Sequence, residues 1–494
     1  MKEKISIHKK LVGDNMIGKS LKIILVLAGV YLLYIVVSCV IVPSFHEPKA
    51  DSSWKPKIDL NQNDIKGVSP DKVVLLQDRE DSGLARLQLI KNAKESVDIS
   101  TYAIHKGPYA DLFFGCIFDA ANRGVKVRIL LDGIVNKFNQ DLRLYSYAIF
   151  AHPNIELKYY EPLHLGKPWT WNNRFHDKLF IIDEEVALVG GRNIGDKYFS
   201  AAGSKGASND RDVLVFTETK RNKASVLTQM ADYYQFVWEH PYTEKAVKKI
   251  SHRKEALGKN KEKEALRSLK NAKDIYPLPI NKDIDWKKDA YPAEKVYFLY
   301  NPHQRINKDP LIWKELVSLS EQATKSIYLE SPYIVPTKKM LEYVDSEKIT
   351  VNHLKVLTNS IASTPNLLAF SGYWFNRKEI IDSVDELFEY QAKTESLHGK
   401  TYIFDGRISL IGSYNLDARS TFLNTETMIL IDSKDFAHYL QKELNKTIDQ
   451  HSLQVLEDGS YKNDNKVKES EAAIWKKLVV KALSYVVKLV DFLV

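Results

Sequence analysis

Two short segments of the chain contain the residue types that phosphodiester chemistry requires. Both have the spacing His-x-Lys-x4-Asp, and in both a Gly lies fourteen residues and an Asn seventeen residues after the His. The motif residues are His176, Lys178, Asp183, His398, Lys400 and Asp405. Chance seldom produces two copies with matching offsets, so the pattern predicts a duplicated unit that builds one active site.

The side chains of these segments match the demands of an anionic phosphodiester. Imidazole titrates near neutrality, so one His can attack phosphorus and the other can serve as general acid and base. Ammonium and amide groups can hold the phosphoryl oxygens and stabilise charge in the transition state. The expected phosphate-binding residues are the two lysines together with Asn193, Asn415 and Ser413. Because these groups handle the charge, the chemistry requires no metal and no cofactor.

Each motif should lie on a short strand that turns back on itself. Residues two apart on a strand point to the same face, so each His and its Lys should lie together. We expect turns at Asp183-Glu184 and Asp405-Gly406. After the return strand, Gly190-Gly191 and Gly412-Ser413 should let the backbone approach a ligand closely, with each Asn near the His of its own copy.

The surrounding sequence predicts an α/β fold. Residues 96–104 and 125–131 have strand character and flank a helical pattern over 110–123, an order typical of a βαβ unit. Similar segments return at 323–327 and 354–357. We therefore expect two similar lobes, each a mixed β-sheet flanked by helices, related by a pseudo-twofold axis and preceded by one transmembrane helix. The expected divisions are 1–45 (basic tail and span), 46–70 (linker), 71–243 (first lobe), 244–294 (solvated charged segment), 295–460 (second lobe) and 461–494 (basic amphipathic tail).

Both ends of the chain indicate a membrane. Residues 23–42 contain no charge and are long enough to cross about 30 Å of hydrocarbon as a helix. Lysines precede this run, so we expect an uncleaved anchor with its N-terminus in the cytoplasm and the catalytic region outside, although Lys49, Lys55 and Lys57 oppose that orientation. Val36–Cys39 loosely matches a lipoprotein box, which leaves lipidation of Cys39 open. The helical pattern over 474–494 suits a membrane interface or, alternatively, docking on the protein's own core.

The overall composition excludes few classes of binding partner. The formal charge is +8, from 71 Lys and Arg against 63 Asp and Glu, which suits lipid head groups or nucleic acid. The two cysteines, Cys39 and Cys116, supply no disulfide framework.

The paired motifs resemble the phospholipase D superfamily over about residues 71–432. That resemblance implies a carboxylate downstream that orients each His, and we expect Glu426 to orient His398. For His176 the expected carboxylate is Asp210 or Asp212, with Asp210 preferred. It also implies that His176 is the nucleophile, that His398 is the acid and base, and that Asp183 and Asp405 have a supporting structural role.

Further stretches are similar to bacterial cardiolipin synthases. They are 190–199, 357–360, 412–420, 424–426 and the tail beginning at Ile474. Many of those enzymes have two N-terminal spans or none obvious, whereas this chain has one. The resemblance implies transfer of a phosphatidyl group from phosphatidylglycerol to a second lipid alcohol, with release of glycerol. Alternatives are a phospholipase D that hydrolyses lipid to phosphatidate, a nuclease of the superfamily and a lipid-binding protein without activity. Arg192 and Arg419 could bind a second lipid phosphate or form ion pairs. The acceptor alcohol, the leaflet and the oligomeric state stay undetermined.

Overall fold

The computed structural model describes residues 20–493, except 61–67, 137, 139, 141, 202, 247–248, 273–279, 281–283, 464–465 and 489. The lysines between residues 1 and 19, on which the expected orientation depends, lie outside the described residues.

Two large β-sheets form the centres of two lobes that repeat the same strand order. The first sheet runs β10-β1-β8-β6-β5-β2-β3-β4-β9, and the second runs β11-β18-β17-β16-β12-β13-β14-β19. Strand β1 of the first sheet corresponds to β11 of the second. From these two strands onward, the strands at equal places in the two orders correspond to one another. The predicted α/β duplication is therefore confirmed.

The first-lobe strands are β1 (Asp71–Leu76), β2 (Ser96–Thr101), β3 (Lys126–Asp132), β4 (Ile155–Tyr160), β5 (Lys178–Ile182), β6 (Val186–Gly190), β8 (Asp212–Thr217), β9 (Thr243–Lys245) and β10 (Tyr291–Pro292). The second-lobe strands are β11 (Lys295–Tyr300), β12 (Ile327–Glu330), β13 (Leu354–Asn359), β14 (Glu386–Tyr390), β16 (Thr401–Phe404), β17 (Ile408–Gly412), β18 (Thr427–Asp432) and β19 (Ser452–Val455). Parallel pairing joins β2, β3 and β4, and likewise β12, β13 and β14, as the βαβ pattern predicts.

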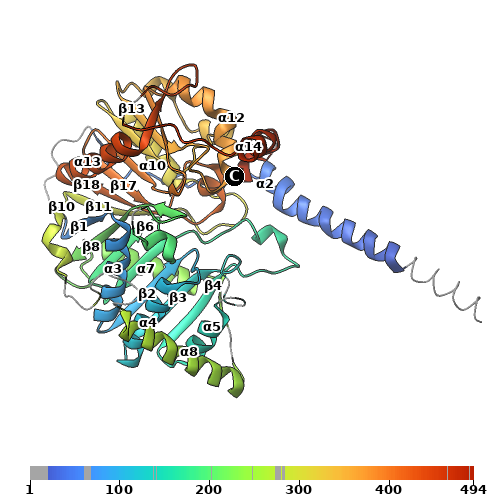
Figure 1. The fold of residues 1–494 in the computed structure, drawn as a ribbon, viewed down its shortest axis with the longest axis vertical. Coiled ribbons are helices and arrows are strands. Elements are labelled where there is room, and N and C mark those ends of the chain that lie inside the picture. Colours follow the sequence, from blue (N-terminus) through green and yellow to red (C-terminus); the bar gives the residue numbers. More distant parts are fainter. Residues whose placement is uncertain are drawn as a thin grey trace, which may run out of the picture.

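Helices cover the sheets of both lobes (Figure 1). In the first lobe they are α3 (Arg79–Asn92), α4 (Pro108–Asn122), α5 (Arg143–Ala151), α6 (Asp196–Phe199), α7 (Val226–Glu239) and α8 (His252–Lys270). In the second lobe they are α10 (Leu311–Gln322), α11 (Lys338–Leu341), α12 (Leu367–Ser383), α13 (Lys434–His451) and α14 (Ile474–Val487).

A continuous hydrophobic core joins the lobes. It contains Leu179 and Val213 from the first sheet, Ile403 and Ile429 from the second, and residues of α7 and α13. Burial of this shared apolar surface favours one fixed arrangement of the lobes, because separating them would expose it to water. The relative position of the two motifs is thus set by the core.

Two segments pack more closely than expected. Within the predicted linker, Ile58 and Leu60 are buried against the second lobe, and the backbone NH of Lys57 donates to Glu315 at 2.9 Å. Within the segment expected to be solvated, α8 packs on α4 and α5, and its Ala265 is buried in the first-lobe core. In both segments, a few small or apolar residues among many charged ones make these contacts. The average composition of each segment therefore did not predict them.

One long apolar helix precedes the lobes. It spans Ser20–Phe45 and is long and apolar enough to cross a membrane. Its last turns contain a π-helical stretch, Val37–Ile41, followed by α2 (Val42–Phe45). Figure 1 shows this helix projecting away from the lobes, with α2 near α14.

The C-terminal helix docks on the second lobe along one side. Val480 and Val487 of α14 are buried, and the helix packs on α12. Its other side exposes large apolar residues, namely Ile474, Trp475, Leu478, Tyr485 and Val486.

Candidate active site

Two short parallel contacts between the lobes bring the motifs together. Phe175 pairs with Thr425 as a parallel bridge, and β15 (Glu395–Leu397) pairs with β7 (Ala207–Asn209) so that Leu397 lies opposite Asn209. In both contacts the residue before a motif His faces the residue before an acidic residue of the other lobe. The contacts therefore repeat the pseudo-twofold relationship.

Each motif His is hydrogen-bonded to a carboxylate from the opposite lobe. Nδ1 of His176 lies 2.9 and 3.0 Å from the carboxylate oxygens of Glu426, and Nδ1 of His398 lies 2.5 Å from Asp210. Glu426 and Asp210 thus hold the histidines, but the expected pairing within one lobe was wrong. The strand that carries each carboxylate bridges to the other lobe, and offsets along the chain contain no information about that bridge.

The motif lysines lie buried beside the histidines. Nζ of Lys178 donates to the carbonyl oxygen of His176 at 2.5 Å, and Nζ of Lys400 donates to that of His398. Lys400 also lies 2.8 Å from Nδ1 of His398 and 3.6 Å from Asp210. Each Lys thus lies beside its own His, but only Lys178 lies on a strand, because both histidines and Lys400 precede β5 or β16.

Burial and neighbouring charges shift the pKa values of the site in different directions. Burial, reinforced by Lys178 and Lys400, lowers the pKa of His176 well below its usual value. Burial likewise lowers the pKa of His398 to about 3 and that of Lys178 to about 7. Burial thus disfavours the charged form of both histidines in the free protein.

The two carboxylates differ from one another. Burial raises the pKa of Glu426 to about 7 against the opposing charge of Lys178. Burial also acts to raise the pKa of Asp210, but Lys400 and the bond with His398 outweigh it and hold that pKa below its usual value. Asp210 is thus a firm anion, whereas Glu426 is close to half-protonated at neutral pH.

Comparison with known proteins agrees with this geometry. The family described as cardiolipin synthase, PLD-like domain, matches residues 87–238 and 316–448, which together are more than half of the chain. The chain belongs to this family. The two matched segments lie within the two lobes, and they contain both His-x-Lys-x4-Asp motifs.

Several relatives align with most of this chain. It is 28% identical to cardiolipin synthase C of Escherichia coli over 73% of this chain and 81% of that one. It is 24% identical to cardiolipin synthase A of Proteus mirabilis over 77% of this chain and 70% of that one. An uncharacterised protein of Helicobacter pylori is 28% identical, over 75% and 78% of the two chains. A phosphatidylserine synthase structure from Haemophilus influenzae shares the fold, with a TM-score of 0.61 at 15% identity, covering 88% of this chain and 98% of that one.

In this cardiolipin synthase-like protein the two motif aspartates act away from the histidines. Asp183 accepts backbone NH groups of Lys94, Glu95 and Ser96 at 2.7–2.9 Å. Asp405 accepts the equivalent NH groups of residues 324–326, at 2.8–3.2 Å. Each Asp follows the strand whose first residues hold the Lys, so it lies about 15 Å from that end. Both stand in the left-handed region, with φ of 54° and 52°. They fix the hairpin turn and the start of the neighbouring strand, which agrees with the supporting structural role that the resemblance implied for these two members of the motifs.

The two asparagines occupy equivalent environments. Nδ2 of Asn193 donates to the hydroxyl of Tyr198 at 3.1 Å, and Nδ2 of Asn415 donates to Ser420 at 3.3 Å. Among the described residues, neither Oδ1 atom has a hydrogen-bond partner although both are buried. Because a hydroxyl can donate or accept, rotating each amide would keep this bond and free Nδ2 for a phosphoryl oxygen.

Ser413 is engaged inside the protein. Its hydroxyl donates to Glu426 at 2.5 Å and accepts the backbone NH of Thr427 at 2.9 Å. The residue is fully buried. Ser413 therefore supports the carboxylate that holds His176, and this contact replaces the expected contact with phosphate.

The glycines after the motifs accommodate neighbouring strands. A Cβ on Gly190 or Gly191 would collide with Asp212 or Asp210, and a Cβ on Gly412 would collide with the carbonyl of Thr427. The expected close approach to a ligand is thus corrected to a close approach of protein strands. Arg192 and Asp212 form a buried ion pair at 2.7 Å, which excludes Asp212 as the partner of a motif His.

The sequence interpretation missed residues that support the histidines. Thr425 Oγ1 accepts the backbone NH of His176 at 3.1 Å and donates to Asp177 at 2.7 Å. The ring of Tyr102 lies 4.9 Å from that of His176, and the ring of Tyr198 lies 6.0 Å from that of His398. Thr425 is adjacent to Glu426 and was within reach of sequence reasoning, but Tyr102 approaches only through packing.

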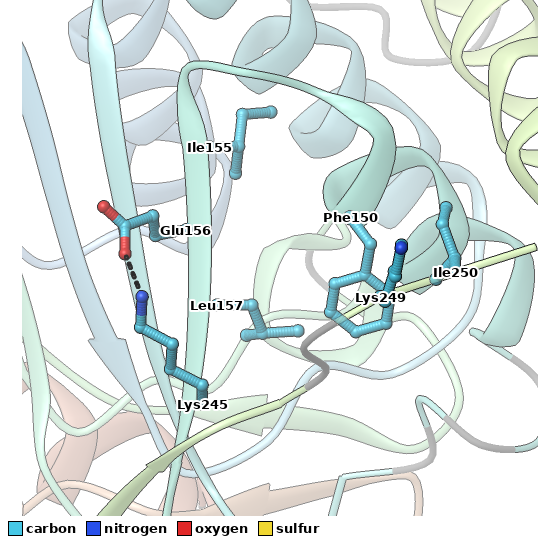
Figure 2. A pocket seen from close by; sticks show the side chains of 7 residues that line it. All are labelled: Phe150, Ile155, Glu156, Leu157, Lys245, Lys249 and Ile250. Atoms are coloured by element: carbon cyan, nitrogen blue, oxygen red, sulfur yellow. Dashed lines mark ion pairs between the residues drawn. The ribbon is translucent and has the colours of Figure 1, made fainter.

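Other features of the described residues lie outside this centre. A small pocket of about 130 Å³ beside β4 is lined by Phe150, Leu157 and Lys249, and Figure 2 also shows its Glu156–Lys245 ion pair. It contains none of the motif residues. Among the described side chains, no group of three or more His, Cys, Asp or Glu is placed to hold a metal ion.

Proposed function

We propose that this protein is a membrane-bound phosphatidyltransferase that makes cardiolipin from two molecules of phosphatidylglycerol. The observation that carries the proposal is the pair of partly buried histidines, each held at Nδ1 by a carboxylate and each beside a buried lysine. With Nδ1 occupied, Nε2 of each ring is the nitrogen left to meet substrate.

In the first step, Nε2 of His176 attacks phosphorus and the bond from phosphorus to the glycerol oxygen breaks. His398, which is an imidazolium at this stage because Asp210 and the bound anionic phosphodiester favour its positive charge, gives its Nε2 proton to the departing glycerol. In the second step, His398 takes the proton from a hydroxyl of the acceptor lipid, whose oxygen attacks phosphorus and releases His176. Lys178, Lys400, Asn193 and Asn415 hold the phosphoryl oxygens throughout.

The unequal carboxylates support this division of roles. Asp210 is anionic and therefore stabilises the imidazolium that His398 must form when it carries a proton. Glu426 has a pKa raised to about 7 by burial, so it favours a positive charge on His176 less strongly. A neutral imidazole is the nucleophilic form, which suits attack by His176.

The membrane features support a lipid substrate. A helix that is long and apolar enough to cross a bilayer leads into the lobes, and α14 exposes apolar residues beside it. The named relatives are cardiolipin synthases, and the net charge of +8 is small for a chain of this size that would bind nucleic acid. We place the catalytic lobes on the extracytoplasmic side, which protease protection in oriented vesicles would test.

Lipid analysis tests the proposal. Purified protein in detergent is incubated with phosphatidylglycerol, with and without phosphatidylethanolamine, beside the variants His176→Ala and His353→Ala. His353 is an exposed histidine outside the site, so its variant is a matched control. Cardiolipin and glycerol that are lost only in His176→Ala support the synthase. Phosphatidate without cardiolipin would instead make the protein a phospholipase D, and no turnover of lipid would contradict both.

A further inference from the structure

A loop of the first lobe lies against the apolar N-terminal helix. This loop, residues 163–171, follows β4 and leads directly to the motif His176. The hydroxyl of Tyr31 donates to the carbonyl of Leu165 at 2.8 Å, and that of Tyr34 donates to the carbonyl of Gly166 at 3.1 Å. Nearer the lobes, Cys39 donates to the carbonyl of Pro168 at 3.1 Å. Three residues spread over more than two helical turns thus hold the loop along the helix.

Several backbone carbonyls of this loop are paired within the protein. The carbonyls of Leu165, Gly166 and Pro168 accept the three bonds from the helix. The carbonyl of residue 164 accepts the backbone NH of residue 167 and the indole NH of Trp171, and that of residue 167 accepts the NH of Thr170. Five consecutive carbonyls therefore have donors. Hydrocarbon supplies no hydrogen-bond partners, so irregular backbone at membrane depth needs such internal partners for its polar groups.

The depth of the contact is set by the helix. Tyr31 precedes Val42, the end of the uncharged run, by eleven residues, which corresponds to about 16 Å of helix. Half the hydrocarbon thickness of a bilayer is about 15 Å. When the uncharged run crosses the membrane, the loop carbonyl that Tyr31 holds lies well inside the same bilayer.

Two side chains of the loop suit that depth. Leu163 and Leu165 are 52% and 64% exposed, although both are large and apolar. His164 is paired with Glu244 at 3.0 Å, and the ring of Trp169 packs on that of Tyr34. Lys167 is exposed, and its long side chain can carry the ammonium to the head groups.

We propose that residues 163–171 form a re-entrant membrane loop, with lipid acyl chains packed against Leu163 and Leu165 in the leaflet that faces the catalytic lobes. The loop also fixes the height of the active site above the bilayer. Asn172 donates to the carbonyl of Cys39 at 2.7 Å, and Arg174, two residues before His176, donates to the carbonyl of Thr170 at 2.8 Å. The inference depends on the spanning helix and does not depend on which phosphodiester is the substrate.

Depth-dependent fluorescence tests the loop directly. Leu165→Cys and Lys442→Cys are each made in the full chain with Cys39→Ser, labelled with an NBD fluorophore and reconstituted into vesicles of phosphatidylcholine and phosphatidylglycerol. The Ser at position 39 keeps a donor for Pro168, and Cys116 is buried and does not compete for label. Lys442 is an exposed residue of α13, which Figure 1 places on the side of the molecule away from the N-terminal helix.

We expect the probe at position 165 to emit at shorter wavelength than the probe at position 442. Lipids with a nitroxide on the acyl chain should quench it several-fold more strongly than they quench the control. Equal quenching at the two positions, with emission typical of water, would overturn the proposal. If Leu165→Cys fails to reconstitute, the same comparison with Leu163→Cys decides.

A second measurement relates the loop to catalysis. Leu163→Glu with Leu165→Glu should reduce turnover of phosphatidylglycerol in vesicles about tenfold or more while leaving turnover of soluble dihexanoyl phosphatidylglycerol unchanged. Equal loss on both substrates would mean damage to the active site and would contradict the role of the loop in placing the site. Failure of the proposed function is separately visible, because the wild-type protein would then turn over neither lipid while the fluorescence result stands.

Discussion

Nδ1 of His176 lies 2.9 Å from the carboxylate of Glu426, a residue 250 positions later in the chain and in the other lobe. The reciprocal contact joins His398 to Asp210 across 188 positions. Neither lobe therefore holds its own histidine in place, and the site is complete only when both lobes have packed on their shared core.

The crossed pairing predicts which variants behave alike. Glu426→Gln should reproduce the defect of His176→Ala, and Asp210→Asn should reproduce that of His398→Ala, with losses of kcat of about 10² to 10⁴. A substrate with a nitrophenol leaving group needs little protonation, so it should rescue the first step in Asp210→Asn and His398→Ala only.

The measurement is the burst of nitrophenol from each variant, with Asp458→Asn as a control at an exposed aspartate. Rescue of Glu426→Gln together with His398→Ala would contradict the crossed pairing.

Ser413 should act on catalysis through Glu426. Because its hydroxyl donates to that carboxylate, Ser413→Ala should lower kcat about tenfold while KM changes less than twofold. Ser413→Thr, which retains a hydroxyl, should recover part of the loss. A large rise in KM with unchanged kcat would instead place Ser413 on the phosphate.

Asp183 and Asp405 should affect stability more than chemistry. Each accepts several backbone NH groups that are exposed or partly buried, and the net contribution of such a hydrogen bond to stability is about 0.5–1.5 kcal/mol. Asp183→Ala and Asp405→Ala should therefore lower the melting temperature in detergent, whereas Asp183→Asn, which keeps an acceptor oxygen, should lower it less. The specific activity of the folded fraction should stay within a few-fold of wild type. An unchanged melting temperature with complete loss of activity would refute this.

The pH profile of kcat/KM should be a narrow bell centred near pH 7. Glu426, with a pKa of about 7, must lose its proton to support His176, so activity should fall on the acidic side. Lys178, also with a pKa of about 7, binds phosphate only when charged, so activity should fall again as pH rises above that value.

Two single variants test the acidic and the alkaline limb of this pH profile separately. Lys178→Arg retains its charge at all accessible pH values and should remove the alkaline limb, although its absolute rate will be lower. Glu426→Gln should remove the acidic limb. A profile that is flat from pH 6 to 8 in the wild type would contradict the assignment.

The sequence by itself determined the repeated architecture and the candidate residues of the site. The offsets of Lys, Asp, Gly and Asn from each His are local, and they follow from strand periodicity and turn geometry, which act over a few residues. The strands and helix between residues 96 and 132 follow from local hydrophobic periodicity for the same reason. The identities of Glu426 and Asp210 as the carboxylates near the histidines were also within reach.

Only the tertiary structure decided which partner each of these groups has. The bridges Phe175–Thr425 and Leu397–Asn209 join opposite lobes, and they form because the lobes bury a common core. The glycine at 190 makes room for Asp212, and the tyrosines of the apolar helix bind a loop more than 130 positions away. Such contacts depend on the packing of surfaces that are distant in the chain, and the free energy that selects them comes from burial of the whole interface. The spacing of residues within a single segment contains no information about this free energy of interface burial.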